Sequence, residues 1–169
     1  MTQQRFDPYL VLGALEGRRV AYVLIGGFAR VVQGTEELTE GLDLTPSTKA
    51  DNLKRLLDAL DELDAERIDG KPLRLDEQTI GREPLIELSS RGGEIKLVPE
   101  PAGTRGGYDD LRRAASREPL GRGLRPRVAS LADLARMTAA LGREQDLEPL
   151  RQLRYLRELE RGRYRGIER

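Results

Sequence analysis

The chain has 169 residues, a length that accommodates one domain with a sizeable core or one domain with a small appendage. Hydrophobic residues make up 38% and charged residues 34%, a composition that excludes a disordered chain. The 29 basic residues balance the 29 acidic ones, so the protein has no net charge that would attract it to nucleic acid or to a membrane. Cysteine and histidine are both absent, so disulfides, thiol nucleophiles and Ser-His-Asp chemistry are excluded, and any metal site must use oxygen ligands, which favours Mg²⁺ or Ca²⁺.

The first part of the chain reads as short helices alternating with apolar strands. Hydrophobic periodicity and glycine or proline boundaries predict a helix within residues 1–19, a strand at 21–27, a helix at 28–34 and a strand at 39–46. The N-terminus lacks the apolar core of a signal peptide, and no apolar run is long enough to span a membrane. We therefore expect a cytoplasmic protein.

The middle of the chain contains the clearest helix and a hairpin. Leucines at helical spacing predict a helix over 47–65, and Thr48 with Asp51 resembles a capping box at its start. The strand-like runs 84–90 and 93–100 are separated by Arg-Gly-Gly, which is typical of a β-hairpin.

The C-terminal part is mainly helical. We predict, in order, a loop at 103–107, a helix at 108–115, a Gly/Pro/Arg-rich connector at 117–127, a strand at 125–130, and helices at 130–141 and 145–161. Ser130 is in position to cap the first of these two helices. The alternation of strands and helices indicates an α/β protein with a helical C-terminus. We divide it into an α/β core at 1–116 and a connector with C-terminal helices at 117–169, packed together as one unit.

The stretch 24–46 carries the most chemical information. A strand that ends in Gly26 and Gly27 and opens a helix presents backbone N–H groups to an anion such as a phosphate. The following strand carries Asp43, and two carboxylates spaced i, i+2 on one strand face can hold a metal ion beside such phosphates.

The ordered set Gly-Gly-Phe-Ala, Thr-x3-Thr-Glu and Leu-Asp-Leu in this stretch resembles the nucleotidyltransferase superfamily, and in particular the AbiEii/MenT-type bacterial toxins. The segments 94–111 and 133–153 look like the later strand, loop and helical part of that family. The resemblance implies a nucleotidyltransferase-like mixed sheet flanked by helices, with a C-terminal helical segment. It also implies transfer of a nucleoside monophosphate from an NTP to the 3′ end of a tRNA, with Mg²⁺ as cofactor and an antitoxin protein or RNA as partner.

The resemblance also implies roles for individual residues. Asp43 and Lys96 occupy catalytic positions, and Asp43 is a metal ligand. The residues implied to bind the nucleotide are Gly26, Gly27, Thr35, Thr39, Arg136 and Asp146.

The chain departs from the family pattern at the metal site. The first metal-binding aspartate of the family falls on Gly41 and the third falls on Lys96, so that one carboxylate, Asp43, is retained. We hypothesise that the Lys96 ammonium takes the place of the metal and forms an ion pair with Asp43.

These replacements leave several functions open. One interpretation is that the chain is a nucleotidyltransferase of the toxin type. A second is that it is a catalytically inactive pseudoenzyme that binds a nucleotide, RNA or antitoxin. A third is that it is a purely structural partner in a toxin–antitoxin complex. Sequence alone does not separate a natural loss of the site from an engineered one.

Other charged residues have both a functional and an ordinary interpretation. The acidic side chains of Glu36, Glu37 and Glu40 either help to hold a metal ion or form a solvated face. The arginine-rich stretch 112–127 either follows an RNA backbone or is an ordinary charged surface of an arginine-rich protein.

Overall fold

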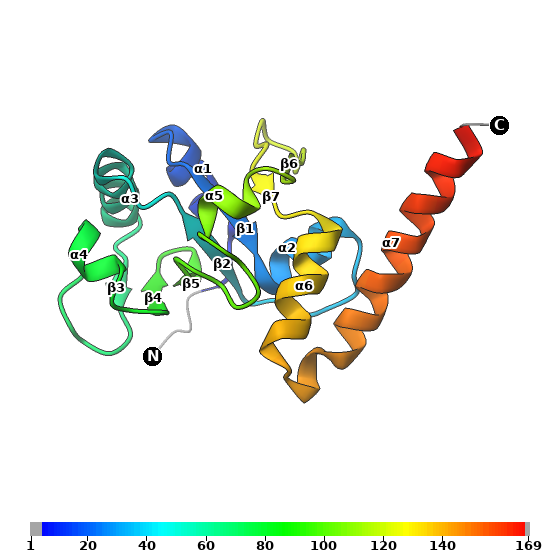
Figure 1. Ribbon diagram of the computed structural model, residues 1–169. Helices are drawn as coiled ribbons and strands as arrows, with labels where there is room; N and C mark the ends of the chain where they lie inside the picture. Colours follow the sequence, from blue (N-terminus) through cyan, green and yellow to red (C-terminus); the bar gives the residue numbers. More distant parts are fainter. Residues whose placement is uncertain (1–4, 168–169) are drawn as a thin grey trace.

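The computed structural model describes residues 5–167 (Figure 1). The helices are α1 (Pro8–Gly17), α2 (Gly26–Gln33), α3 (Ala50–Glu62), α4 (Glu77–Ile80), α5 (Tyr108–Leu111), α6 (Leu131–Leu141), the 3₁₀ turn η1 (Glu144–Asp146) and α7 (Leu147–Ile167). The strands are β1 (Tyr22–Ile25), β2 (Gly41–Pro46), β3 (Glu66–Arg67), β4 (Ile86–Ser90), β5 (Gly93–Leu97), β6 (Ser116–Arg117) and β7 (Arg127–Val128).

All the strands belong to one mixed sheet with the order β3-β4-β5-β2-β1-β7-β6. The pairs β1–β7 and β2–β5 are parallel, and the remaining pairs are antiparallel. The expected α/β class, with a mixed sheet flanked by helices and a C-terminal helical segment, is confirmed. The predicted hairpin is also present, because β4 and β5 pair across the turn at Arg91 and Gly92.

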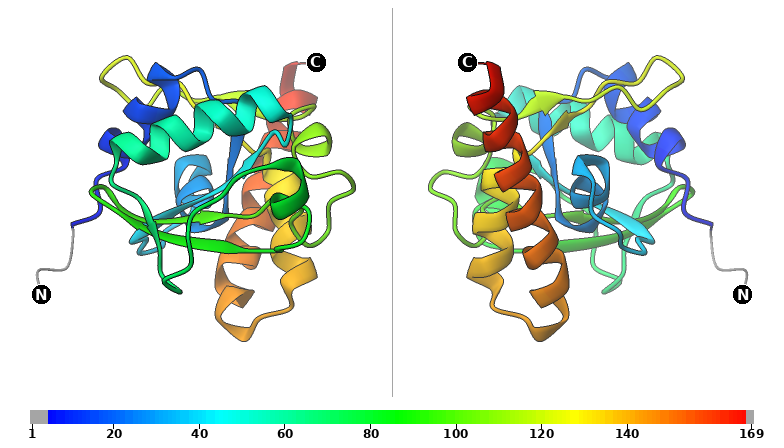
Figure 2. Two further views of the ribbon diagram at one scale, coloured as in Figure 1. Left: turned by 90° about the vertical axis from the view of Figure 1, so that its left-hand side faces the viewer. Right: turned by 90° about the vertical axis from the view of Figure 1, so that its right-hand side faces the viewer.

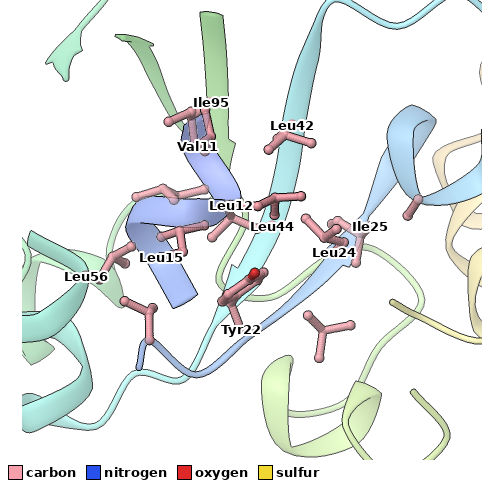
Figure 3. Close-up of a cluster of buried hydrophobic side chains, with 14 of the residues drawn as sticks. Val11, Leu12, Leu15, Tyr22, Leu24, Ile25, Leu42, Leu44, Leu56 and Ile95 are labelled. Carbon is pink, nitrogen blue, oxygen red and sulfur yellow. The ribbon is translucent and has the colours of Figure 1, made fainter. Parts of the chain in front are cut away.

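The main core lies between one face of the sheet and the helices α1 and α3. Leu42 and Leu44 of β2 are fully buried, and the residue between them, Asp43, is only half-buried because it points to the opposite face. Figure 3 shows side chains of α1 such as Leu12 and Leu15 lying among the leucines of the sheet. Alternation along β2 therefore separates an apolar face from the face that carries Asp43.

The helices are distributed on both sides of the sheet. Figure 1 shows α1, α3 and α4 on one side, and α2, α6 and α7 on the other. The helices α6 and α7 run side by side, and the C-terminal end of α7 reaches beyond α6 (Figure 2). Within the described range 5–167, no helix is both long enough and apolar enough to cross a membrane.

The start of α3 differs from the predicted capping box. Its N-cap is Lys49, and no side chain in the described part of the chain caps the helix there, so the expected cap at Thr48 is wrong. Asn52 organises this corner instead: its Nδ2 donates to the carbonyl oxygens of Ala21 and Ser47 at 2.9 and 2.8 Å, and its Oδ1 accepts from the Ala21 N–H at 2.7 Å. The buried asparagine thus joins the start of α3 to the start of β1.

The predicted connector at 117–127 is more ordered than expected. Its two ends form the antiparallel pair β6–β7, and β7 in turn pairs with Leu24 of β1. The helix α5 is correspondingly shorter than the predicted 108–115. On the outside, the Arg122 guanidinium lies 4.1 Å from the centre of the Tyr9 ring. This cation–π contact holds the loop between β6 and β7 against α1.

The helix α6 follows its predicted boundaries closely, whereas α7 starts near the predicted position 145 but continues past the predicted end at 161 to Ile167. Ser130 caps α6 as expected, because its Oγ accepts the Asp133 N–H at 3.1 Å, and Gly142 ends the helix in the left-handed conformation. The leucines of α7 recur every three residues, whereas a helix turns every 3.6 residues. The stripe therefore drifts around the helix, so that Leu153 is buried while Leu147 and Leu159 are exposed.

Candidate functional site

The central strands bring two predicted site residues to the same face of the sheet. In the register of β2 against β5, Asp43 is opposite Lys96, and in the register of β2 against β1 it is opposite Ile25. Register partners point to the same side of a sheet, so the side chains of Asp43 and Lys96 lie next to each other. We call these two residues the strand pair.

The glycine turn at the end of β1 lies directly beside the strand pair. Gly26 has a φ of 71°, in the left-handed region that favours glycine. A Cβ placed on Gly26 would collide with Oδ2 of Asp43 and would lie 2.8 Å from its Cγ. Only glycine therefore allows the start of α2 to approach Asp43 so closely, and the predicted proximity of the glycines to this aspartate is confirmed.

A cavity of about 480 Å³ opens in front of the glycine turn. Its polar side includes the turn, the strand pair and two arginines. Its apolar side is formed by α6, the loop before β4 and the loop after β5. The residues that line it are Ile25, Gly26, Gly27, Arg30, Asp43, Pro84, Leu85, Lys96, Val98, Glu100, Pro101, Ala102, Leu134, Met137, Thr138, Leu141 and Arg143. The cavity suits a ligand with one charged end and one apolar body.

The strand pair does not form the ion pair that we expected from the sequence. Among the residues that the structure describes, no carboxylate oxygen lies within 4.0 Å of the Lys96 ammonium, and Asp43 has no hydrogen-bond donor. Side chains on neighbouring strands stand roughly perpendicular to the sheet, so a long lysine and a short aspartate end at different heights. Both charges are therefore free to interact with a molecule in the cavity.

The cavity wall perturbs the titration of Asp43. Burial raises the pKa of the Asp43 carboxyl above its usual value, while the positive charges of Lys96, Arg30 and Arg143 act in the opposite direction. Burial dominates because these cations are not bonded to the carboxylate. The site thus holds its one strand carboxylate in surroundings that disfavour its charge.

Beside the glycine turn lies a largely buried polar network, which we call the arginine network. It consists of Arg30, Thr35, Glu37, Thr138, Arg143 and Asp146. The Arg30 guanidinium donates to both oxygens of Glu37, from Nη2 at 2.8 Å and from Nε at 2.9 Å. Thr35 Oγ1 donates to Glu37 at 2.6 Å. The interactions join α2 to the loop that precedes β2.

The same network extends to the C-terminal helices. The Oγ1 atom of Thr138 on α6 lies 3.5 Å from Nη1 of Arg30, and Asp146 Oδ1 lies 3.9 Å from its Nη2. Asp146 also accepts the Nε–H of Arg143 at 2.5 Å. Arg30, Thr35, Thr138 and Asp146 are all buried, so the network fixes α6 and η1 against α2 and thereby shapes the cavity wall.

The structure separates the predicted site residues into two groups. Gly26, Gly27, Asp43 and Lys96 line the cavity together. The remaining residues lie outside the lining: Thr35 and Asp146 belong to the arginine network, Thr39 packs behind Gly27, and Arg136 pairs with Asp110 at 3.2 Å and Asp133 at 3.0 Å on the surface of α6. Glu37, which we interpreted as part of a metal site or a solvated face, is instead the buried partner of Arg30.

Sequence reasoning missed Arg30 and the apolar side of the cavity. Arg30 is four residues after Gly26 in a short helix, which places both on one face of α2, and this spacing was the available signal. Met137 of α6 is part of the hydrophobic core and also faces the cavity. Its exposure to a ligand depends on how α6 packs, which no local pattern reports.

The residues present do not fit Mg²⁺. Within residues 5–167 no group of three acidic side chains is close enough to hold a metal ion. Gly41 is the position at which the sequence resemblance leads us to expect the first metal-binding aspartate. A Cβ on Gly41 would lie 2.7 Å from the backbone oxygen of Glu94. Since Mg²⁺ requires oxygen ligands in octahedral geometry, the strand face beside the glycine turn, with one carboxylate next to an ammonium group, is a poor site for it.

The fold is similar to that of several nucleotidyltransferases of known structure. The lincosamide antibiotic adenylyltransferase LnuA, solved with lincomycin bound, is 14% identical, with a TM-score of 0.61 over 90% of this chain and 99% of that chain. The antibiotic-resistance factor ANT(2″)-Ia is 14% identical, with a TM-score of 0.57 over 95% of this chain and 92% of that chain.

A Thermotoga maritima protein described as a nucleotidyltransferase is 18% identical, with a TM-score of 0.57 over 88% of this chain and 89% of that chain. No protein-family model and no curated protein sequence matches the chain. The structural likeness shows that the chain has the nucleotidyltransferase fold, and at these identities it shows the fold alone.

Proposed function

We propose that this protein is a catalytically inactive member of the nucleotidyltransferase-fold proteins, and that it binds a nucleotide in the glycine-lined cavity without a divalent metal ion. One observation carries this proposal: the strand face beside the glycine turn presents one carboxylate, Asp43, next to an ammonium group, Lys96. Phosphoryl transfer in this fold depends on cations that neutralise the charge developing on the phosphates. Here the chain supplies a fixed cation where a metal ligand would be needed.

The packing of β2 against β5 supports the same proposal. Because Gly41 faces the backbone of Glu94, a carboxylate at that position requires the two strands to move apart. The site therefore differs from a metal site in its backbone spacing as well as in its side chains. A single replacement that restores the aspartate at position 41 is not expected to restore a metal site.

The glycine turn and the cavity support the nucleotide-binding half of the proposal. The N–H groups at the start of α2, with Lys96 and Arg143 beside them, are suited to phosphate oxygens. The apolar side of the cavity is suited to a base and a sugar. The RNA and antitoxin partners that the sequence resemblance implies stay predictions.

The proposal is tested by calorimetric titration of the protein with nucleoside mono- and triphosphates, once with Mg²⁺ and once with EDTA. We expect saturable binding of at least one nucleotide, with an affinity that Mg²⁺ does not increase. Binding that appears only with Mg²⁺ would contradict the proposal, and so would the absence of binding to all of them.

A second assay tests the loss of catalysis. The protein is incubated with labelled NTPs, Mg²⁺ and total tRNA, and we expect no transfer of label to the RNA. The same assay on the double variant Gly41→Asp, Lys96→Asp is also expected to show no transfer, because of the close approach of β2 and β5. Transfer by the unmodified chain would show that it is an enzyme.

A further inference from the structure

The charged groups around the cavity are unequally available to a ligand. Three cations line it: Arg30, Lys96 and Arg143. Arg30 is held by Glu37, and the Nε–H of Arg143 is held by Asp146. In the described part of the chain, Lys96 is the lining cation without an ion pair, and the Nη groups of Arg143 donate no hydrogen bond. The free donors are therefore one ammonium group, one end of a guanidinium and the N–H groups of the glycine turn.

The lining also contains two carboxylates, on Asp43 and Glu100. Asp43 is the closer of the two to the glycine turn, because its Oδ2 lies against Gly26. In a metal-dependent site the bound cation would screen such a carboxylate from the phosphates of a ligand. Here three fixed cations, Lys96, Arg30 and Arg143, act on it, but Glu37 holds Arg30 and Asp146 holds Arg143. Lys96 is therefore the main charge left to offset Asp43 when additional phosphates enter the cavity.

From this balance we propose that the cavity selects nucleotides with a single phosphate group over nucleoside triphosphates. The inference rests on the proposed nucleotide-binding function and specifies its ligand class. The free donors suffice for the oxygens of one phosphate, whereas the second and third phosphates of a triphosphate are repelled by Asp43 and Glu100. The base and sugar lie against the apolar side formed by Leu134, Met137 and Leu141 of α6.

The test compares the two ligand classes in EDTA. The protein is titrated with the mono- and triphosphates of adenosine, cytidine, guanosine and uridine, and with the four nucleosides. For the base that binds best, we expect a dissociation constant at least tenfold lower for the monophosphate than for the triphosphate, and weaker binding of the nucleoside. A triphosphate that binds as tightly as the monophosphate overturns this inference but leaves the proposed function standing, whereas failure of every nucleotide to bind overturns the proposed function.

Two variants test the physical cause. Lys96→Met is expected to weaken monophosphate binding at least tenfold, and Lys54→Met, which removes an exposed lysine of α3 outside the lining, is its matched control. Asp43→Asn is expected to strengthen triphosphate binding, and thereby to bring the dissociation constants of the monophosphate and the triphosphate closer together. If the ratio of the two dissociation constants is the same in Asp43→Asn as in the unmodified protein, the role assigned to this carboxylate is contradicted. Lys96→Gln replaces Lys96→Met if circular dichroism shows that the latter is unfolded.

Discussion

Beside the glycine turn, the Arg30 guanidinium is largely buried and pairs with Glu37 and Asp146, whereas Asp43 and Lys96 face the cavity and make no ion pair within 4.0 Å among the described residues. Both regions lie next to the same turn in space, and both combine acidic and basic side chains. Buried charges are stable only when paired, so the arginine network has a structural role. The strand pair contributes little to folding and is available to a ligand. The contrast indicates that pairing, rather than charge itself, separates residues with a structural role from residues that are available to a ligand.

The largest expected effect concerns the arginine network. Glu37→Ala leaves the Arg30 guanidinium buried without its bidentate partner, and we expect a loss of about 3–5 kcal/mol in the free energy of unfolding, measured by urea denaturation. Glu36→Ala, which removes an exposed neighbour, is the control and is expected to change stability by less than about 0.5 kcal/mol. Exposed ion pairs contribute up to about 1 kcal/mol. If Glu37→Ala lost less than this, the pairs of the arginine network would be no more stabilising than surface pairs, and the two regions would not differ.

A smaller effect is expected at the turn between the two regions. Gly26→Ala combines a left-handed backbone with a Cβ that collides with Asp43, and we expect a loss of about 1–3 kcal/mol in the same measurement. The control is Gly13→Ala in α1, where an added Cβ meets no atom within 4 Å. That variant is expected to gain about 0.5–1 kcal/mol from helix propensity. Equal effects of the two substitutions would show that the close approach at Gly26 is absent.

The next prediction concerns the pH dependence that the strand pair contributes. Because the pKa of Asp43 is raised above 3.8 by burial, the folded protein retains a proton that the unfolded chain loses as the pH rises. The contribution of Asp43 is therefore most favourable below that value and is lost as the pH rises through the folded-state pKa. We expect Asp43→Asn to be more stable than the unmodified protein at pH 7, with a difference that shrinks toward acidic pH in urea denaturation. A difference that grows toward acidic pH would have the wrong sign.

The smallest effect on stability is expected for Lys96. Since no ion pair within 4.0 Å involves its ammonium in the described structure, Lys96→Met is expected to unfold within about 0.5 kcal/mol of the unmodified protein while its monophosphate binding weakens. Thermal unfolding followed by circular dichroism provides the comparison. A loss as large as that of Glu37→Ala would assign Lys96 to the structural region instead.

Much of the fold could be predicted from local patterns. Leucines at helical spacing, the Arg-Gly-Gly turn of the hairpin and the cap at Ser130 each depend on residues close in sequence, and each prediction was confirmed. The prediction at Thr48 was wrong because Asn52, bonded to the start of β1, determines how α3 begins. The strand predicted at 125–130 is present as β7, but its partner β6 was missed, because in the described sheet β6 is held only by pairing with β7 across the intervening loop.

For the candidate site, the sequence by itself pointed to the glycine turn, to Asp43 and to Lys96, because the resemblance places these residues at fixed positions of one ordered motif. Only the tertiary structure decided which charges are paired. Arg30 meets Thr138 and Asp146 from helices more than a hundred residues away, and Gly41 meets the backbone of β5 through strand packing. Local spacing sets the period of a helix or strand, but the distance between two charges on separate elements depends on how those elements pack.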